Sequence, residues 1–224
     1  GEKEILMERL RGVPAGVFFG KGKTNNWGVE EIQGPSADDI SEEAFRLYAK
    51  LHSKYWRDPS VLDYDWLRGA DWLKGEGRGA WVEAQMLAAD AWKGIDTTHW
   101  DRHLVECVNA SLAKIDWDDF QAELKARPWT VVHGDAHPHN ILRVDGRLVL
   151  IDFEMVGLGS NAQELGQFLI SHMVPDERRQ HEERLVRHYY DALGLQETYS
   201  FEACWREYLD GGAGRWLWFV PYLA

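Results

Sequence analysis

Cysteine, long apolar runs and positive charge are all scarce in this sequence. Its 224 residues include two cysteines, Cys107 and Cys204, which are too few for a disulfide scaffold and lack metal-ligand spacing. The longest apolar run, residues 216–224, is too short to cross a bilayer, and residues 1–4 do not form a signal-peptide pattern. We therefore expect reduced thiols, no membrane span and a cytoplasmic protein.

The charge balance is acidic. Lysine and arginine total 25 against 37 aspartates and glutamates, which gives a formal net charge of −12. A phosphate backbone selects for clustered Lys and Arg, so we expect no nucleic-acid partner. Hydrophobic residues, at 45%, are too abundant for a disordered chain. Aromatic residues are plentiful, and the 12 tryptophans indicate a well-packed core or an aromatic ligand surface.

Helix and strand patterns together predict an α+β fold. Apolar side chains at helical spacing predict most of the helices, and short β-branched or aromatic runs predict strands. Asp145-Gly146 joins two such runs, 141–144 and 148–151, and predicts a β-hairpin inserted in a mostly helical body. The expected helices cover residues 1–12, 38–56, 81–92, 99–115, 118–126, 161–173, 175–193 and 201–219, and the other expected strands cover 16–20, 27–32 and 130–132.

Polar residues on both sides of this hairpin carry the strongest signal for chemistry. Asn140 lies just before the first strand and Asp152 just after the second, so antiparallel pairing should bring their side chains together. Asp135 precedes Asn140 by five residues, in a loop opened by Gly134. Three oxygen-bearing side chains would then converge, and oxygen ligands without thiolate suit Mg²⁺ and substrate phosphates. A carboxylate that the metal does not need can accept a proton from a hydroxyl.

Two motifs beside the hairpin resemble the phosphate-transfer signature of the aminoglycoside phosphotransferase and choline kinase superfamily, whose members are relatives of protein kinases. The motifs are His133-Gly134-Asp135-x-x-x-x-Asn140 and Ile151-Asp152-Phe153-Glu154. The resemblance implies a protein-kinase-like fold that moves the ATP γ-phosphate to a hydroxyl of a small molecule. It implies that Asp135 is the catalytic base and that His133 braces the catalytic loop. It also implies that Asn140 and Asp152 hold Mg²⁺.

The same resemblance implies two lobes. Residues 1–34 would form a partial N-terminal lobe with a helix, two strands and a hinge, and residues 35–224 a helical C-terminal catalytic lobe. Glu4 matches the position of the αC-type glutamate, and the backbone near Glu31 and Ile32 would receive adenine. The family's glycine-rich strand pair and phosphate-contacting lysine are not found in the sequence, so we expect a truncated small β lobe. Glu164 stands where many relatives have aspartate.

Other interpretations of these polar residues stay open. His133, His137 and His139 form a dense cluster, and imidazole is a common zinc ligand, although the short spacing makes one tetrahedral site awkward. Asp and Asn beside hairpins also cap turns. Residues 20–24 end in Gly-Lys-Thr like a phosphate-binding loop, but Val17 stands where that motif needs glycine, which favours an exposed basic turn.

Two functional hypotheses follow. The first is an ATP- and Mg²⁺-dependent small-molecule kinase whose acceptor is a hydroxyl compound of the aminoglycoside, choline or steroid-like class. The second is a catalytically impaired kinase-fold remnant that acts as a structural or interaction subunit of a larger complex. The absent glycine-rich loop and the aromatic segment 216–220 favour the second. We interpret that segment as a helix packed on the body, with an interface for a protein partner as the alternative.

Overall fold

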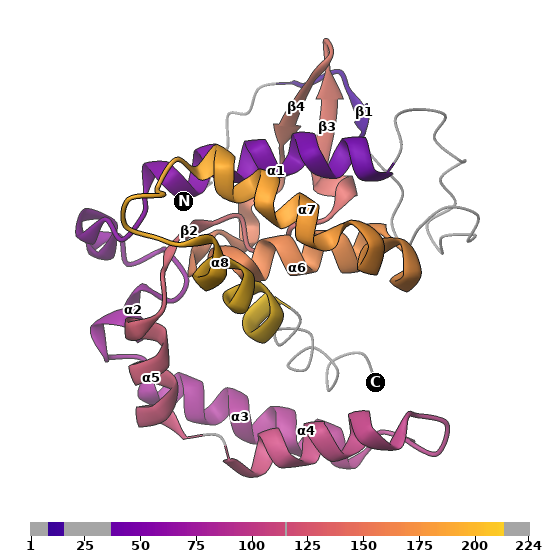
Figure 1. Cartoon of the computed structure of the whole chain (residues 1–224). Helices are drawn as coiled ribbons and strands as arrows, with labels where there is room; N and C mark the ends of the chain where they lie inside the picture. Colours follow the sequence, from indigo (N-terminus) through magenta and orange to yellow (C-terminus); the bar gives the residue numbers. More distant parts are fainter. Residues whose placement is uncertain (1–8, 16–36, 115, 213–224) are drawn as a thin grey trace.

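The computed structural model describes residues 9–15, 37–114 and 116–212, and helices predominate among them (Figure 1). The helices are α1 (Ala37–Lys54), α2 (Ala70–Lys74), α3 (Arg78–Lys93), α4 (Arg102–Lys114), α5 (Trp117–Ala126), α6 (Asn161–His172), α7 (Pro175–Leu193) and α8 (Phe201–Glu207), and a π-helical turn follows at Tyr208–Gly212. The strands are β1 (Val13–Pro14), β2 (Thr130–Val132), β3 (Ile141–Val144), β4 (Arg147–Leu150) and β5 (Gly157–Gly159). The predicted α+β class is confirmed.

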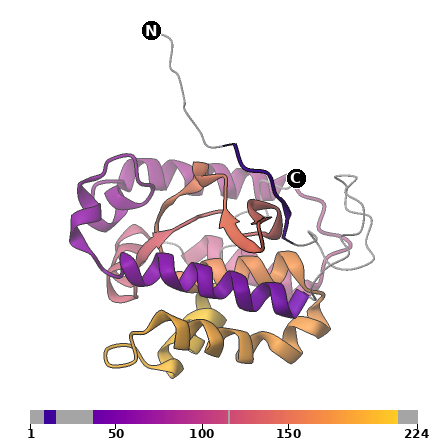
Figure 2. The same ribbon diagram turned by 90° about the horizontal axis from the view of Figure 1, so that it is seen from above.

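The main hydrophobic core lies where α1, α6 and α7 pack together. α1 and α7 run side by side in both ribbon views (Figures 1 and 2). Phe45 and Tyr48 of α1 are fully buried, and their rings meet Phe168 of α6 edge to face at centroid distances of 6.1 and 6.0 Å. Tyr189 of α7 completes the cluster, 6.3 Å from Phe45. Aromatic pairs favour this geometry, so the core gives a firm base to the loop described below.

Two small sheets lie on this helical base. In the first, the order is β1-β3-β4, and β3 pairs with β4 in an antiparallel register that sets Ile141 opposite Leu150. Asp145 and Gly146 form the turn with φ angles of 48° and 77°, as expected for a tight hairpin turn that needs positive φ. In the second sheet, β2 and β5 pair antiparallel. The ends of β2, β3 and β4 therefore meet beside the same loop.

Helices α2 to α5 form an arm below this body (Figure 1). Its interior is aromatic: Trp81 and Trp117 are buried, and both rings pack on Phe120 at 5.2 and 5.9 Å. Trp92 is buried as well, and its indole N–H donates to Asn109 Oδ1 at 2.8 Å. Three of the tryptophans thus serve as core residues, in line with the well-packed core that the tryptophan count indicated.

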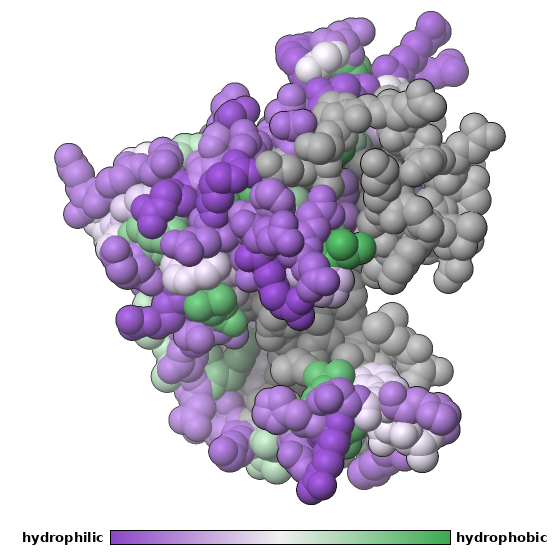
Figure 3. Space-filling view, turned by 45° about the vertical axis from the view of Figure 1, so that its right-hand side comes forward, coloured by the Kyte–Doolittle hydropathy of each residue, from purple (hydrophilic) through white to green (hydrophobic). Residues whose placement is uncertain are grey.

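The described part of the surface is largely polar on the face that Figure 3 shows. Hydrophilic residues cover most of the face in Figure 3, and apolar residues form separate patches on it. Among the described residues, no helix combines the length and the apolar character needed to cross a membrane.

The helix and strand predictions are confirmed for the hairpin and for most helices. The predicted helix over residues 1–12 is wrong in its described part, because residues 9–12 are irregular and lead into β1, which pairs with β3. The last helix also differs, since α8 ends at Glu207 and the backbone continues as a π-helical turn. The predicted strands 16–20 and 27–32 lie outside the described residues. Sequence reasoning missed β5, whose Gly-Leu-Gly sequence carries little strand signal.

Candidate active site

The loop that follows β2 carries the first predicted motif. β2 delivers His133, Gly134 and Asp135, and the short 3₁₀ helix Pro138–Asn140 then leads into β3. β4 ends at Leu150, so Asp152 follows the return strand of the hairpin. The backbone N–H of Ile151 donates to the carbonyl of Asn140 at 3.0 Å and closes the base of the hairpin. The two motifs are therefore brought to one place, as the sequence predicted.

The carboxylate of Asp135 is held by three side-chain donors. Gln167 Nε2 donates to Oδ1 at 3.0 Å, and Asn140 Nδ2 donates to Oδ2 at 2.9 Å. His137 Nε2 lies 3.2 Å from the same Oδ2. These contacts, the one from His137 foremost, outweigh partial burial and lower the pKa of Asp135 below its ordinary value. The carboxylate is therefore ionised at neutral pH and fixed in direction, as a group that orients a hydroxyl must be.

His133 is fully buried and holds the loop from within. Its Nε2 lies 2.7 Å from the Ile151 carbonyl oxygen, to which it donates, and its Nδ1 accepts from the Asp135 backbone N–H at 3.3 Å. Both ring nitrogens are thus engaged within the protein, and neither is left to bind a metal. Among the described residues, no three His, Cys, Asp or Glu side chains are grouped as a metal site requires. The three-histidine zinc alternative is therefore wrong.

The donor set next to Asp135 fits Mg²⁺. Asn140 is buried and directs its amide nitrogen to Asp135, contacting both the carboxylate and the main-chain oxygen of that residue, which leaves the amide oxygen as its ligand atom. Asp152 is exposed and takes a left-handed backbone conformation with φ 63°, at the start of the 3₁₀ helix Phe153–Met155. An amide oxygen and an exposed carboxylate at the base of one hairpin are hard ligands of the kind that Mg²⁺ prefers.

A buried glutamate–histidine pair anchors the same loop to the helical core. Glu164 of α6 has no exposed surface; its Oε1 accepts from the Gly134 backbone N–H at 2.8 Å, and its Oε2 lies 2.8 Å from His52 Nε2. His52 Nδ1 in turn lies 2.8 Å from the Tyr189 hydroxyl. Burial alone would raise the pKa of Glu164, but the hydrogen bonds and the charge of its partners lower it overall. The network ties the loop to α1, α6 and α7.

Gly134 is the point of closest approach in the loop. Its φ is 86°, and a Cβ atom there would lie 2.0 Å from the main-chain oxygen of Met155. A left-handed conformation and backbone contact both require glycine at this position. The loop of Asp135 is thus packed directly against the segment that follows Asp152.

Not every predicted site residue can be placed. Glu4, Glu31 and Ile32 lie outside the described residues. Conversely, sequence reasoning missed the contacts that Gln167 and His137 make with Asp135. Gln167 follows Glu164 by three positions on α6, and this helical spacing is a signal that could have pointed to a shared face.

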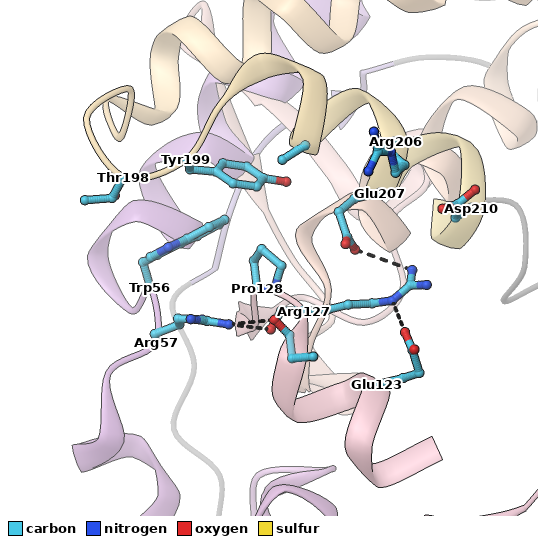
Figure 4. Close-up of a pocket in the computed structure, with 12 residues that line it drawn as sticks. Trp56, Arg57, Glu123, Arg127, Pro128, Thr198, Tyr199, Arg206, Glu207 and Asp210 are labelled. Atoms are coloured by element: carbon cyan, nitrogen blue, oxygen red, sulfur yellow. Dashed lines mark hydrogen bonds and ion pairs between the residues drawn. The ribbon is translucent and has the colours of Figure 1, made fainter. Parts of the chain in front are cut away.

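A separate cavity of about 540 Å³ lies at the far end of β2, between the end of α1, the end of α5 and α8 (Figure 4). Arg127 crosses it, with Nε 2.9 Å from Glu123 Oε2 and Nη1 3.6 Å from Glu207 Oε2. Trp56 and Tyr199 form an aromatic wall, with ring centroids 5.0 Å apart. None of the predicted site residues lines this cavity.

Comparison with known proteins decides the family. The model of the phosphotransferase enzyme family matches residues 6–203, which is most of the chain. The chain belongs to this phosphotransferase family. The resemblance inferred from the two motifs is thereby confirmed, and the match includes both of them. No curated protein sequence matches the chain.

Two solved structures are similar to this chain. One is the crystal structure of an aminoglycoside-3'-phosphotransferase of type VIII, with 17% identity and a TM-score of 0.42, covering 90% of this chain and 67% of that one. The other is a glucosamine kinase, with 20% identity and a TM-score of 0.40, covering 84% of this chain and 53% of that one. The chain thus spans about half the length of the second relative.

Proposed function

We propose that this chain carries out ATP- and Mg²⁺-dependent transfer of the γ-phosphate to a hydroxyl group of a small molecule. The observation that carries the proposal is the Asp135 carboxylate, ionised and held by Gln167, Asn140 and His137 beside the base of the hairpin that bears Asp152. Membership in the phosphotransferase family supports the reaction class. The acceptor would be an amino sugar, choline, a steroid or a similar hydroxyl compound.

Asp135 would act by positioning more than by basicity. One carboxylate oxygen is 3.0 Å from Gln167 and the other is shared by Asn140 and His137, so the group cannot rotate freely. A fixed carboxylate accepts the acceptor's O–H and turns its oxygen toward the γ-phosphorus. A low pKa makes it a weak base, which suits a reaction whose proton leaves late in a loose transition state. His133 and Glu164 would keep the loop in place from behind.

Asn140 and Asp152 would hold Mg²⁺. The metal supplies charge neutralisation on the nucleotide phosphates when it is bound. The protein's own contribution is the rigid spacing of the two ligands, set by the hydrogen bond from Ile151 N–H to the Asn140 carbonyl. Asn140 contacts Asp135 through its amide nitrogen, so the metal ligand and the hydroxyl-orienting group move as one unit.

The test compares Asp135→Asn and Asp152→Asn with the control Asp145→Asn, in the full-length protein. Asp145 is exposed at the opposite end of the same hairpin, and asparagine tolerates its positive φ. Isothermal titration should show Mg·ATP binding in the wild type and in Asp145→Asn, and a loss of at least tenfold in Asp152→Asn. Asp135→Asn should still bind Mg·ATP but should fail to phosphorylate acceptors in a panel of amino sugars, choline and steroids.

Two outcomes would count against the proposal. If both active-site variants transfer phosphate from ATP at the wild-type rate, the assignment of Asp135 and Asp152 is wrong. If the wild type does not bind Mg·ATP, the second hypothesis, a catalytically impaired subunit of a larger complex, takes its place.

A further inference from the structure

Arg68 lies in the loop that connects the 3₁₀ helix Pro59–Asp63 to α2, far in sequence from both motifs. The structure nevertheless joins it to the segment that follows Asp152. Its carbonyl accepts from the Leu158 backbone N–H at 2.7 Å, and Arg68 and Gly157 form an isolated parallel bridge. The loop is therefore fixed to β5, which pairs with the strand leading into the catalytic loop.

Two glycines allow this contact. A Cβ atom on Gly157 would lie 2.6 Å from the Arg68 carbonyl oxygen, and one on Gly69, whose φ is 80°, would lie 2.8 Å from the Leu158 carbonyl oxygen. Both distances are too short for any side chain, so the two backbones touch directly. The position of the Arg68 backbone is thus determined by main-chain contacts on both sides.

The side chain of Arg68 reaches toward the catalytic loop. Its Nη1 donates to the sulfur of Met155. Met155 in turn packs on Gly134, since a Cβ on that glycine would lie 3.1 Å from Met155 Cβ. Met155 is also the last residue of the 3₁₀ helix that begins directly after Asp152, and three residues of such a helix span about 6 Å. The guanidinium therefore lies beside both the loop of Asp135 and the turn of Asp152.

The charge of Arg68 is not neutralised by any carboxylate among the residues that the structure describes. Its one hydrogen-bond acceptor there is a thioether, which is a weak one. Other arginines are used differently: Arg143 makes a two-pronged ion pair with Glu43, and Arg57 donates to two main-chain carbonyls. The exposed guanidinium of Arg68 thus keeps N–H donors that no carboxylate among the described residues uses, and such a fork suits phosphate oxygens.

We propose that Arg68 is a further catalytic residue that contacts the phosphoryl group in transit; this rests on the proposed function. In that step the acceptor oxygen bonds to the γ-phosphorus while the bond from that phosphorus to the bridging oxygen of ATP breaks. The leaving ADP keeps the electron pair, and the hydroxyl proton passes to Asp135. Arg68 makes and breaks no bond. Its N–H groups hold the equatorial oxygens of the phosphoryl group, where negative charge is spread in the transition state.

The experiment uses Mg·ADP with and without fluoroaluminate, which imitates a phosphoryl group between donor and acceptor. Wild type, Arg68→Ala, Arg68→Lys and the control Arg102→Ala would be compared by isothermal titration. Arg102 is an exposed arginine on α4 whose partner, Glu106, lies on the same helix. All four proteins should bind Mg·ADP with equal affinity. Fluoroaluminate should tighten binding in the wild type and in Arg102→Ala, with most of that gain lost in Arg68→Ala and part of it kept in Arg68→Lys.

A kinetic readout completes the test. Loss of one such donor should lower kcat by about 100-fold with little change in the KM for ATP, and millimolar guanidinium ion should restore part of the rate in Arg68→Ala but not in Arg102→Ala. If Arg68→Ala keeps the full fluoroaluminate gain, the assignment of Arg68 is overturned while the proposed function stands. If the wild type does not bind Mg·ADP, both are overturned.

Discussion

Replacing Glu164 tests whether the buried Glu164–His52 pair holds the loop of Asp135. Glu164 has no exposed surface and links His52 to the backbone of Gly134 through two hydrogen bonds of 2.8 Å. Glu164→Ala would leave the Gly134 N–H and the His52 ring without their partner inside the core. Removing one member of a buried pair costs about 3–5 kcal/mol of unfolding free energy. A loss of this size is a large fraction of the unfolding free energy of an ordinary domain.

Glu164→Gln separates charge from hydrogen bonding. The amide oxygen can still accept from Gly134, and its nitrogen can donate to His52 Nε2 if the imidazole proton moves to Nδ1 and donates to Tyr189. The geometry of the network then survives, and only the charge-assisted part of two hydrogen bonds is lost. Since charged hydrogen bonds exceed neutral ones by about 1 kcal/mol each, we expect a cost of about 2 kcal/mol.

The pH dependence gives a second, independent check. The folded-state pKa of Glu164 is lowered, so its contribution is complete above the unfolded-state value of about 4.3 and is lost as pH falls through the lower folded-state value. Glutamine does not titrate there. The difference in stability between wild type and Glu164→Gln should therefore be largest near neutral pH and should shrink on acidification below about pH 4.

Urea denaturation followed by circular dichroism at pH 7 and at pH 3 measures these differences. Glu106→Gln, an exposed glutamate paired with Arg102 on the surface of α4, is the matched control and should change stability by less than about 0.5 kcal/mol. The reasoning fails if Glu164→Ala costs no more than this control, or if the cost of Glu164→Gln does not depend on pH.

Three shorter predictions concern the same loop. Gly134→Ala and Gly146→Ala both place alanine at a positive φ, but only the alanine at position 134 would meet an obstructing atom. Calorimetry should show a loss of unfolding free energy of about 1 kcal/mol for Gly146→Ala. The loss for Gly134→Ala should be larger by about 1–3 kcal/mol. The acid limb of the kcat–pH profile should lie below the ordinary aspartate value of about 3.9, and His137→Ala, which removes the main cause of the lowered Asp135 pKa, should shift that limb to higher pH. Thr130→Val removes a buried 2.8 Å hydrogen bond to the His52 carbonyl and should cost about 1–2 kcal/mol in urea denaturation, whereas an unchanged midpoint would contradict it.

The parts of the fold that follow local rules could be predicted from the sequence. Asp145-Gly146 between two β-branched runs predicts the hairpin, because the residues at the turn themselves supply the positive φ angles. The helical limits of α7 are local in the same way, with Pro175 and two acidic residues in its first turn and Gly194 in a left-handed conformation after its end. The hairpin also brings the backbones of the two motifs together, through the hydrogen bond from Ile151 N–H to the Asn140 carbonyl.

The contacts that hold the candidate site depend on long-range packing and could not be predicted. His52 and Glu164 are 112 positions apart, and no local pattern relates them. β5 forms because it pairs with β2, although its two glycines disfavour a strand. The requirement for glycine at 134 becomes visible only once Met155 is placed against it.

The carboxylates of Asp135 in the loop and of Glu164 on α6 are both ionised, but for different reasons, and this separates the proposed catalysis from folding. Asp135 is partly exposed, and the neighbouring side chains of His137, Gln167 and Asn140 lower its pKa. Glu164 is wholly buried, and its pKa is lowered by groups that belong to the core and the loop backbone. Removing the charge of Asp135 should therefore abolish transfer while the fold persists, whereas removing that of Glu164 should weaken the fold and displace Asp135 through Gly134.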